Sequence, residues 1–562
     1  MKLLPNSRRG LLGRALLAAV LVIGLTVTAT TVGGVLQFKQ IGQLIGKNAF
    51  GSKNVVLPKP GAPETILLIG SDWRHGEPQT ATHTDTMMLL RLNDRSQTVN
   101  AMSVPRDLEV QNPQTHRPIK LNGIYSLPGS QGGPDGLLSV LRKQVFPKLQ
   151  VNHVIDVNFS GFSDLVDAIG CVYSQVDHRY YNVSSPPGTP DNYSSINIQP
   201  GYQPLCGHHL SSSGALPFVR FRHTDSDKVR NARQQDFIRW ARTNYSANDM
   251  VSNQGTLERI FGQHARTDRS LGSIDGLVDL FNLVVGAQSG NLSMKTISFP
   301  QNFGNCDGKG QCYSYACPTT AECGGQVNHG PPIGHSTEAE RAAYKSFIAA
   351  IPGKPKKAKP SPPPKPKPKP KASKHGGAKH HGHAKSPPAS KLPAGVSPAG
   401  LVADGRDGQL QARQLKHVPF PVYYPNYVPR TANYCISLTD NCVAANEPAQ
   451  AYAHSYPRYY KLLGSDHKRY ASYVMTLDVN AALGQYMTVE GTKWQNAPIL
   501  RDPDHTVNLG GRQLDEYMDG SKLALVAWRT SNAVYWVSNT LDNAIPASQM
   551  LGMAATLTGP SH

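Results

Sequence analysis

Residues 65–72 read TILLIGSD, an unbroken run of apolar side chains that ends in a small residue and an acid. A run of this length and composition predicts a strand that is buried on both faces of a sheet. Two more strands are predicted nearby, at residues 87–92, which follow Asp85, and at residues 98–104, which end close to Arg106. Each strand therefore brings a charged side chain to one of its ends, where a rigid sheet commonly positions functional loops.

Helices and strands are also predicted farther along the chain. Apolar side chains at helical spacing predict helices at residues 134–145, 161–170, through most of 236–290, and at 337–351. Strands are predicted at residues 153–159, 171–176 and 292–299, and a Pro/Ser/Asn-rich loop at 180–204. We therefore assign residues 41–352 to one folded region.

A second informative stretch, RFRHTDSDKVRNARQQ at residues 220–235, is rich in guanidinium groups. The apolar residues before it predict a strand, on which Arg220 and Arg222 would point to the same face. A helix after the loop would place Arg230 and Gln234 on one face. Because the planar fork of arginine matches phosphate oxygens, the stretch is predicted to clamp a phosphate or pyrophosphate. The alternative is the solvated start of a charged helix.

Two carboxylates accompany these arginines, Asp72 and Asp85. Two carboxylates together with phosphate oxygens are a common ligand set for magnesium, and arginines then neutralise the remaining phosphate charge. The chain has no Walker loop, no dinucleotide-binding glycine fingerprint and no GxSxG elbow. The residue types therefore indicate metal-assisted phosphoryl or pyrophosphoryl transfer outside the cell.

The net charge of +19 is concentrated in two segments. Twelve lysines and no acid lie in residues 353–391, and four basic residues lie in the first fourteen. The rest of the chain is close to neutral, so the charge does not indicate a nucleic-acid-binding surface. No nucleic-acid partner is predicted.

Residues 15–36 are apolar apart from threonines, and basic residues precede them. The run is long enough to cross a bilayer, and the charge asymmetry places the N-terminus in the cytoplasm and the bulk of the chain outside. A cleaved signal peptide, with a twin-arginine hint at residues 7–9, is the alternative. We assign residues 1–40 to a cytoplasmic tail and a single transmembrane anchor.

Eight cysteines occur in the chain. Cys171 and Cys206 flank one hydrophobic block, Cys435 and Cys442 are seven apart, and four more lie at residues 306–323. The even number suits disulfides in an oxidising compartment. Zinc is the alternative for the group of four, although its spacing lacks the short pairs that are common in zinc sites.

Residues 353–414 are assigned to a Pro/Lys/His-rich disordered linker, and residues 415–562 to a C-terminal globular domain of unknown role. A hairpin is predicted from residues 522–528 and 533–538, and a closing helix from 543–557. The tryptophans of this domain either form its core, which we favour, or a carbohydrate-stacking surface; they are Trp494, Trp528 and Trp536.

Four motifs together resemble the LytR-CpsA-Psr (LCP) family. They are LLIGSDWR at residues 67–74, TDTMM at 84–88, SVPRD at 103–107 and the arginine stretch at 220–235. Their shared order makes the resemblance specific, and it covers residues 62–300, a little under half of the chain. The Ala/Gly/Pro content and the Pro-Lys linker resemble actinobacterial wall proteins, for which arabinogalactan and teichoic acid are the candidate polymers.

The resemblance implies a membrane-anchored enzyme that moves a glycopolymer from a polyprenyl-pyrophosphate carrier onto peptidoglycan. It implies an α/β fold, a mixed-sheet α-β-α sandwich. We expect this domain to be joined to an N-terminal transmembrane helix and, through the linker, to a small α+β C-terminal domain. It also implies an apolar pocket for the lipid, with candidate lining residues Phe159, Phe162, Leu165 and those of the helices after residue 236.

The same resemblance implies roles for individual residues. Asp72 and Asp85 would hold Mg2+ (or Mn2+). The catalytic set would be Asp85, Arg106, Arg220 and Arg222. The pyrophosphate-binding set would add Arg230, Gln234 and Lys120. Asp107, and either Asp225 or Asp227, would brace the arginines.

Three other functions stay open at this point. Water attacking the same site would give a polyprenyl-pyrophosphate hydrolase. A wall-binding scaffold would use the linker and the C-terminal domain without catalysis. A transcriptional regulator fits worst, because the anchor leaves only about fourteen residues in the cytoplasm and no DNA-binding module.

Overall fold

The computed structural model describes most of two folded regions. The described residues are 49–57, 59, 62–74, 78–93, 98–182, 195–207, 214–221, 225, 227–244, 256, 260, 263–271, 293–300, 337–349, 399–435, 442 and 456–559. The predicted anchor, the cysteines at 306–323 and most of the linker lie outside these residues. Within them, no helix combines the length and the apolar character needed to cross a membrane.

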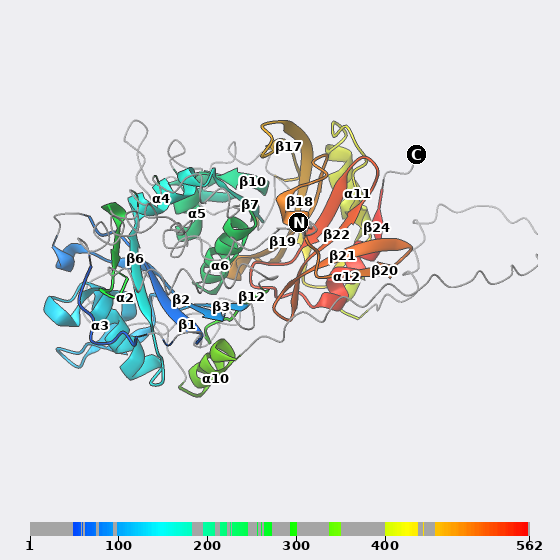
Figure 1. Cartoon of the computed structure of the whole chain (residues 1–562). Coiled ribbons are helices and arrows are strands. Elements are labelled where there is room, and N and C mark those ends of the chain that lie inside the picture. The colour runs from blue at the N-terminus through cyan, green and yellow to red at the C-terminus, as the bar shows by residue number, and fades with distance from the viewer. Residues whose placement is uncertain are drawn as a thin grey trace, which may run out of the picture.

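A six-stranded mixed sheet forms the centre of the first region (Figure 1). Its order is β11 (Ala265–Thr267), β6 (His153–Asn158), β1 (Glu64–Ser71), β2 (Thr84–Asn93), β3 (Thr98–Ser103) and β12 (Ser293–Thr296). β2 is antiparallel to β1 and β3, whereas β6 is parallel to β1 and β12 is parallel to β3. The N-terminal end of β2 therefore shares one edge with the C-terminal ends of β1, β3, β6 and β12, and we call it the Asp85 edge.

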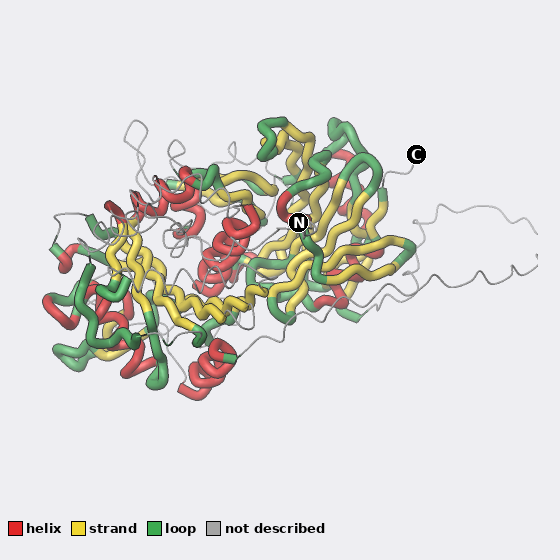
Figure 2. The backbone as a smooth tube through the Cα atoms, in the orientation of Figure 1, coloured by secondary structure: helices red, strands yellow, loops and turns green. Residues whose placement is uncertain are grey.

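Both faces of this sheet are covered by helices (Figure 2). Ile66 and Leu68 belong to a core with α4 (Phe159–Ala168), α5 (Ala215–Arg220) and α6 (Asp227–Asn244). Leu67 and Ile69 belong to a second core with α2 (Leu121–Tyr125), α3 (Gly133–Val140) and α10 (Thr337–Ile348). Alternate residues of β1 thus enter two apolar layers, which explains its unbroken apolar sequence. The predicted mixed sheet is confirmed.

Two sequence predictions in this region are wrong. Residues 215–220 form the helix α5 instead of a strand, because a short apolar run does not distinguish a buried strand from a buried helix. Residues 180–204 are not simply a loop, since they contain β8 (Tyr180–Asn182), β9 (Ile196–Ile198) and most of β10 (Gly201–Leu205). β10 pairs with β7 (Val172–Val176), and a disulfide between Cys171 and Cys206, a pairing that the sequence left open, closes that pair.

The remaining short elements of the first region lie close to the two layers of helices. They are the hairpin of β4 (Glu109–Gln111) and β5 (Pro118–Lys120), the short helices at Gln79–Ala81 and Gly129–Gln131, and a wider helical turn at Leu141–Val145 that extends α3. The β4–β5 hairpin matters for the site, because Lys120 ends it and Arg106 lies shortly before it.

The second region contains an eight-stranded antiparallel sheet. Its order is β16 (Asn433–Tyr434), β18 (Arg469–Asn480), β19 (Gln485–Thr492), β23 (Val534–Ser538), β22 (Lys522–Arg529), β21 (Arg512–Asp519) and β20 (His505–Leu509), and β17 (Arg458–Leu463) pairs with β18. The predicted β22–β23 hairpin is confirmed. So is the closing helix, α12 (Ala547–Ala555), which packs on β22 and β23.

The second region begins earlier than the sequence predicts. β13 (Leu401–Ala403) and α11 (Gly405–Gln414) lie within the segment assigned to the linker. β13 pairs with β15 (Tyr427–Pro429), and β14 (Tyr424–Pro425) pairs with β24 (Leu557–Thr558). The linker boundary at residue 414 is therefore wrong, because a short polar helix resembles linker in composition. Trp494, Trp528 and Trp536 are at most 5% exposed, which confirms that they belong to the core.

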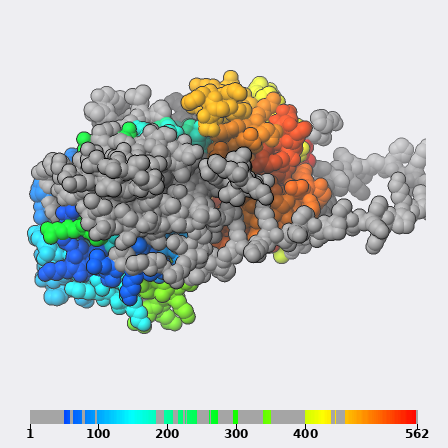
Figure 3. Space-filling view, viewed as in Figure 1, coloured from blue at the N-terminus to red at the C-terminus, as the bar shows by residue number. Residues whose placement is uncertain are grey.

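The two regions pack against each other. Tyr173 and Tyr202 of the first region share an apolar cluster with Val474 and Trp536 of the second. In Figure 1, β7, β10 and α6 lie at this junction, and Figure 3 shows the yellow-to-red surface of the second region adjoining the first. The C-terminal region is therefore in contact with the helices and strands that cover one face of the first sheet.

Candidate functional site

The centre of the site is Asp85, at the N-terminal end of β2. Its carboxylate accepts hydrogen bonds from Nη1 of Arg106 and, at 2.7 Å, from Nε of Arg220. Burial alone would raise the pKa of Asp85, but the charges of Arg220, Arg106 and Arg230 hold this pKa well below its usual value. The structure thus brings together an ionised carboxylate and three guanidinium groups from separate parts of the sequence.

Each arginine is placed by the end of a regular element. Arg106 follows β3, Arg220 is the last residue of α5, and Arg230 lies in the first turn of α6, where it is 2% exposed. The guanidinium of Arg220 also lies over the ring of Phe159, 4.2 Å from its centroid. Arg222, predicted as the fourth arginine, lies outside the described residues.

Gln234 links three elements around this cluster. Its Nε2 donates to Oγ1 of Thr86 in β2 at 2.9 Å and to the carbonyl oxygen of Val219 in α5 at 3.1 Å. The side chain therefore holds α6 against β2 and against the turn that carries Arg220. The prediction that Gln234 belongs to the site is consistent with this position, whereas its contact with pyrophosphate stays a prediction.

Asp107 braces the basic side chains beside it, as predicted. It is 1% exposed, and its carboxylate lies 3.3 Å from Nζ of Lys120 and 3.9 Å from Nε of Arg106. Lys120 therefore lies close to the cluster, at the end of β5, and its described ion pair is with a carboxylate. Its predicted contact with pyrophosphate is not tested by this geometry.

Asp72 follows β1 on the Asp85 edge and is more open than Asp85. Its side chain is 39% exposed, and its Oδ1 accepts a hydrogen bond from the backbone nitrogen of His83 at 2.5 Å. Burial, with a further contribution from the charge of Asp85, raises the pKa of Asp72. The described residues contain no group of three or more His, Cys, Asp or Glu side chains arranged to hold a metal.

A buried polar network supports the end of β1 and the start of the loop that carries Asp72. This network was not predicted from the sequence. Asp156 accepts hydrogen bonds from Oγ of Ser71 at 2.7 Å and from Tyr125, and pairs with Arg266 at 2.7 Å. The guanidinium of Arg266 lies 4.6 Å from the ring centroid of Trp73. The available signal was the lone acid in the apolar strand β6, because a buried charge requires partners.

An apolar pocket opens beside the arginines. It is lined by residues of β1, β2, α4, α5 and α6, among them Met88, Phe162 and Phe237, and it reaches Arg220 and Gln234. Phe159 and Phe162, predicted as lining residues, do line it. Leu165 is instead part of the core at 4% exposure.

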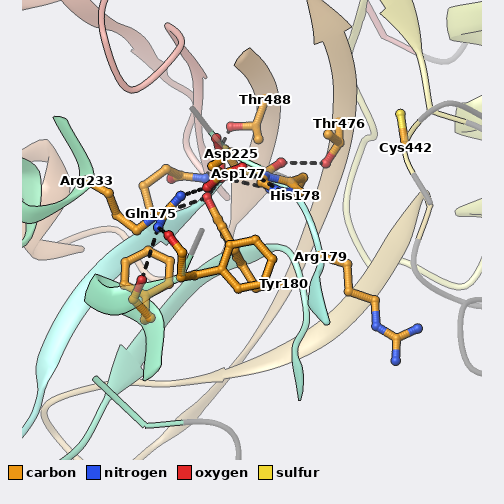
Figure 4. A network of polar contacts seen from close by, with 12 residues as sticks. Gln175, Asp177, His178, Arg179, Tyr180, Asp225, Arg233, Cys442, Thr476 and Thr488 are labelled. Atoms are coloured by element: carbon orange, nitrogen blue, oxygen red, sulfur yellow. Dashed lines mark hydrogen bonds and ion pairs between the residues drawn. The ribbon is translucent and has the colours of Figure 1, made fainter. Parts of the chain in front are cut away.

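The connection between α5 and α6 is held by a buried ion pair (Figure 4). Asp225 pairs with Arg233, and both side chains are fully buried. Nη1 of Arg233 also donates to the carbonyl oxygens of Phe218 and Phe221, at 3.2 and 2.9 Å. Arg233 thus fixes the C-terminal end of α5, where Arg220 lies. Asp225 braces an arginine, as predicted, although that arginine is Arg233.

The second region packs directly on this connection (Figure 4). The ring of Tyr486 in β19 stacks on His178, with centroids 4.1 Å apart, and Oγ1 of Thr476 in β18 donates to the carbonyl oxygen of Asp177 at 2.9 Å. Gly484, in the turn between these strands, lies against Asp225. The turn of the C-terminal sheet therefore contacts the residues that hold the arginines.

Two ion pairs extend these contacts along α6. Nζ of Lys228 lies 2.8 Å from Asp542, and Nη2 of Arg239 lies 2.8 Å from Asp519. Elsewhere at the junction, Glu490 of β19 accepts a hydrogen bond from the backbone nitrogen of Tyr202 at 3.0 Å, and burial raises the pKa of Glu490 to about 7. The C-terminal region thus contacts α6 from its first turn to its middle.

Comparisons with known proteins agree with the first region. The sequence profile of the LytR_cpsA_psr family matches residues 39–323, half of the chain. A Bacillus cereus relative named polyisoprenyl-teichoic acid–peptidoglycan teichoic acid transferase TagU is 29% identical over 194 residues, which cover 34% of this chain and 55% of the relative. A relative of the same name from Halalkalibacterium halodurans is 25% identical over 288 residues, which cover 49% and 85%. The match thus spans about half of the first relative.

Solved structures give weaker similarities. A Bacillus subtilis protein named TagV and a Streptococcus agalactiae protein both superpose with a TM-score of 0.35, at 18% and 20% identity. The superpositions cover 51% and 44% of this chain, and 97% and 81% of the two neighbours.

Proposed function

The chain belongs to the LytR_cpsA_psr family, and we propose that it transfers a glycopolymer from a polyprenyl-pyrophosphate carrier to peptidoglycan. The names of the relatives support a teichoic acid–peptidoglycan transfer in those proteins. In this chain, the observation that carries the proposal is the convergence of Arg106, Arg220 and Arg230 on Asp85 beside an apolar pocket.

The two parts of the site match the two parts of such a donor. The pyrophosphate carries several negative charges, which guanidinium forks bind bidentately. The prenyl chain is apolar and fits the pocket lined by Met88 and Phe237, which reaches Arg220. A prenyl pyrophosphate would therefore bind with its charged end at the arginines and its tail under α4, α5 and α6.

In the proposed reaction, a hydroxyl of peptidoglycan attacks the phosphorus that carries the glycopolymer. A phosphodiester forms, the bond between the two phosphates breaks, the hydroxyl proton is released to water, and polyprenyl phosphate leaves with an added negative charge. Arg106, Arg220 and Arg230 would stabilise that charge, because preorganised donors in a site with little water act most strongly on charge that develops during the reaction. The ion pairs with Asp85 would hold the guanidinium groups in place before the lipid binds.

Magnesium or manganese is a further part of the proposal. The two carboxylates of the site fit a hard cation that completes its shell with phosphate oxygens and water. Asp72 is the more available ligand because it is 39% exposed, whereas both carboxylate oxygens of Asp85 accept hydrogen bonds from arginine. A bound cation would neutralise pyrophosphate charge, and it would also relieve the repulsion between the carboxylates that contributes to the raised pKa of Asp72.

We also propose that the protein acts outside the cell while anchored by residues 15–36. The support is the apolar sequence of that segment and the basic residues before it. The Cys171–Cys206 and Cys435–Cys442 disulfides agree with an oxidising compartment. An actinobacterial source stays a prediction, since the relatives described above come from other bacteria.

The proposal is tested with the full chain in detergent, a polyprenyl-pyrophosphate glycolipid, and peptidoglycan fragments, with and without magnesium. Arg106→Ala should lower turnover by about 100-fold or more, because it removes a donor to the developing charge. Arg117→Ala is the matched control, as Arg117 is exposed near β5. Phosphate release that does not require peptidoglycan would identify a hydrolase. Equal turnover in the two variants would exclude this site as the catalytic centre, and no turnover in the unchanged protein would favour a wall-binding scaffold.

A further inference from the structure

A polar cleft lies between the two regions, on a different side of α6 from the apolar pocket. The first region contributes Ser103 at the end of β3, Asn231 and Gln235 of α6, and Lys295 of β12. The second region contributes the β21–β22 turn, with Lys522, and residues 541–543. We call it the interdomain cleft. Because both regions form its walls, it exists only where they pack together.

The cleft carries positive charge that its own carboxylates do not balance. Its two aspartates already have cationic partners, since Asp542 pairs with Lys228 and Asp519 pairs with Arg239. Lys522 donates to the backbone oxygen of Asp542 at 3.0 Å, which leaves its charge uncompensated. Neither Lys522 nor Lys295 forms an ion pair within the described part of the chain. Two ammonium groups therefore remain for an anionic ligand.

The cleft is also lined by neutral polar side chains. Asn231 is 7% exposed, and its side chain forms no hydrogen bond with any residue that the structure describes. Its amide atoms are not among the fully buried ones that lack a partner, so they are open to solvent. Ser103 and Ser521 line the same space, and the hydroxyl of Ser103 accepts a hydrogen bond from Gln235 at 3.1 Å. Amide and hydroxyl groups together suit the hydroxyl groups of a sugar.

The position of the cleft connects it to the candidate site. Ser103 ends β3, three residues before Arg106, so it lies towards the Asp85 edge. Lys295 belongs to β12, the neighbouring parallel strand, and lies opposite Asn100, farther from that edge. Asn231 and Gln235 follow Arg230 and Gln234 by one residue, which turns them by about 100° around the axis of α6. One side of α6 thus faces the arginine cluster and the apolar pocket, and the next side faces the cleft.

We propose that the interdomain cleft binds a segment of an acidic glycan, a chain of hydroxylated sugars that carries a carboxylate or phosphate. Lys295 and Lys522 would bind the anionic group, and Asn231 with the serine hydroxyls would bind the sugar hydroxyls. This inference rests on the proposed function, in which two glycans must reach the Asp85 edge while the lipid occupies the other side of α6. It assigns a role in substrate binding to the C-terminal region.

The first test measures binding to the full chain in detergent without any turnover. The probe is the disaccharide of N-acetylglucosamine and N-acetylmuramic acid, which carries one carboxylate, and diacetylchitobiose is the matched neutral probe. We expect the acidic probe to bind more tightly, with an affinity that falls as salt rises. The double variant Lys295→Met with Lys522→Met should weaken its binding by about 10-fold, the size expected for two partly exposed charge contacts.

The matched control is the double variant Lys416→Met with Lys461→Met, which removes the same charge from exposed positions of the second region. It should bind the acidic probe as the unchanged protein does. Equal affinities for the two probes, or equal losses in the two double variants, would overturn the proposal for the acceptor glycan.

A kinetic test then distinguishes the two glycan sources. In the transfer assay, the double cleft variant should raise KM for the peptidoglycan fragment if the acceptor occupies the cleft, and KM for the glycolipid if the donor glycan does. Either change supports the proposal, and unchanged values of both overturn it. Failure of the proposed function is a separate result, because specific binding of the acidic probe without any transfer would keep the cleft and reject the reaction.

Discussion

Replacement of Gly484 by alanine tests whether the C-terminal region holds the arginine cluster in place. Gly484 lies in the turn between β18 and β19 with a φ of +72°. A Cβ at this position would lie 3.0 Å from Cγ and 3.1 Å from Cα of Asp225, and would overlap its Oδ1. Asp225 is fully buried and paired with Arg233, so it has no open space into which it can move.

The size of the effect follows from two separate contributions. Alanine in the left-handed region of φ and ψ costs roughly 1 kcal/mol. This backbone cost applies at Gly484 and equally at Gly511, whose φ is +75°. Gly511 has no heavy atom within 4 Å of the added Cβ, so Gly511→Ala carries only this backbone cost. Gly484→Ala must also displace Asp225 and strain a buried ion pair, which adds about 2 kcal/mol if roughly half of the pair is lost.

The displacement should lower the rate of catalysis as well as stability. Asp225 holds Arg233, which holds the end of α5, where Arg220 contacts Asp85. Because a shift of about 1 Å in a catalytic group lowers rates by up to about 100-fold, we expect Gly484→Ala to lower kcat by 10- to 100-fold. The assay is transfer from the glycolipid, with urea unfolding measured in parallel. If Gly484→Ala and Gly511→Ala have the same kcat, the C-terminal region does not position the arginines.

Two further predictions concern buried charges. Burial raises the pKa of Glu490 from 4.5 to about 7, so between these pH values the folded protein keeps a proton that the unfolded chain releases. The free energy of unfolding should therefore fall by about 3 kcal/mol as pH rises from about 4.5 to 7, and it should level off above pH 7. Urea unfolding measured at several pH values should show that the unfolding free energy of Glu490→Gln depends less on pH. An unchanged pH dependence would assign the effect to other groups. Asp107→Asn removes the negative charge that pairs with Arg106 and Lys120, so it should destabilise the protein by about 3 kcal/mol and raise KM for the glycolipid. An unchanged KM would show that Asp107 contributes to folding alone.

The parts of this structure that were predictable have strong local patterns. β1 was predictable because every one of its central side chains is apolar, and only a doubly covered strand requires that. Asp85 and Arg106 were predictable as site residues because each lies beside the end of such a strand. The hairpin of β22 and β23 was predictable from its short polar turn between two apolar segments.

The parts that were missed depend on contacts between distant segments. α5 is only six residues long, so its sequence does not show a helical period, and its helical state is set by its packing. Asp156 and Arg266 are separated by 110 residues and meet only because β6 and β11 pair. β9 alternates buried and exposed side chains over three residues, which is too short a pattern to separate it from a loop.

The contact between the two regions is the most consequential of these long-range features. Trp536 and Tyr202 share one apolar cluster, and Thr488 and Glu490 bind Gln175, so polar and apolar contacts both cross the junction. A fragment that ends at residue 352 would expose these buried groups and would release the turn that holds Asp225. Such a fragment would therefore differ from the whole chain in the geometry of its arginines, and its inactivity would say nothing against the proposed reaction. The chemistry proposed for the first region has to be tested with the second region in place.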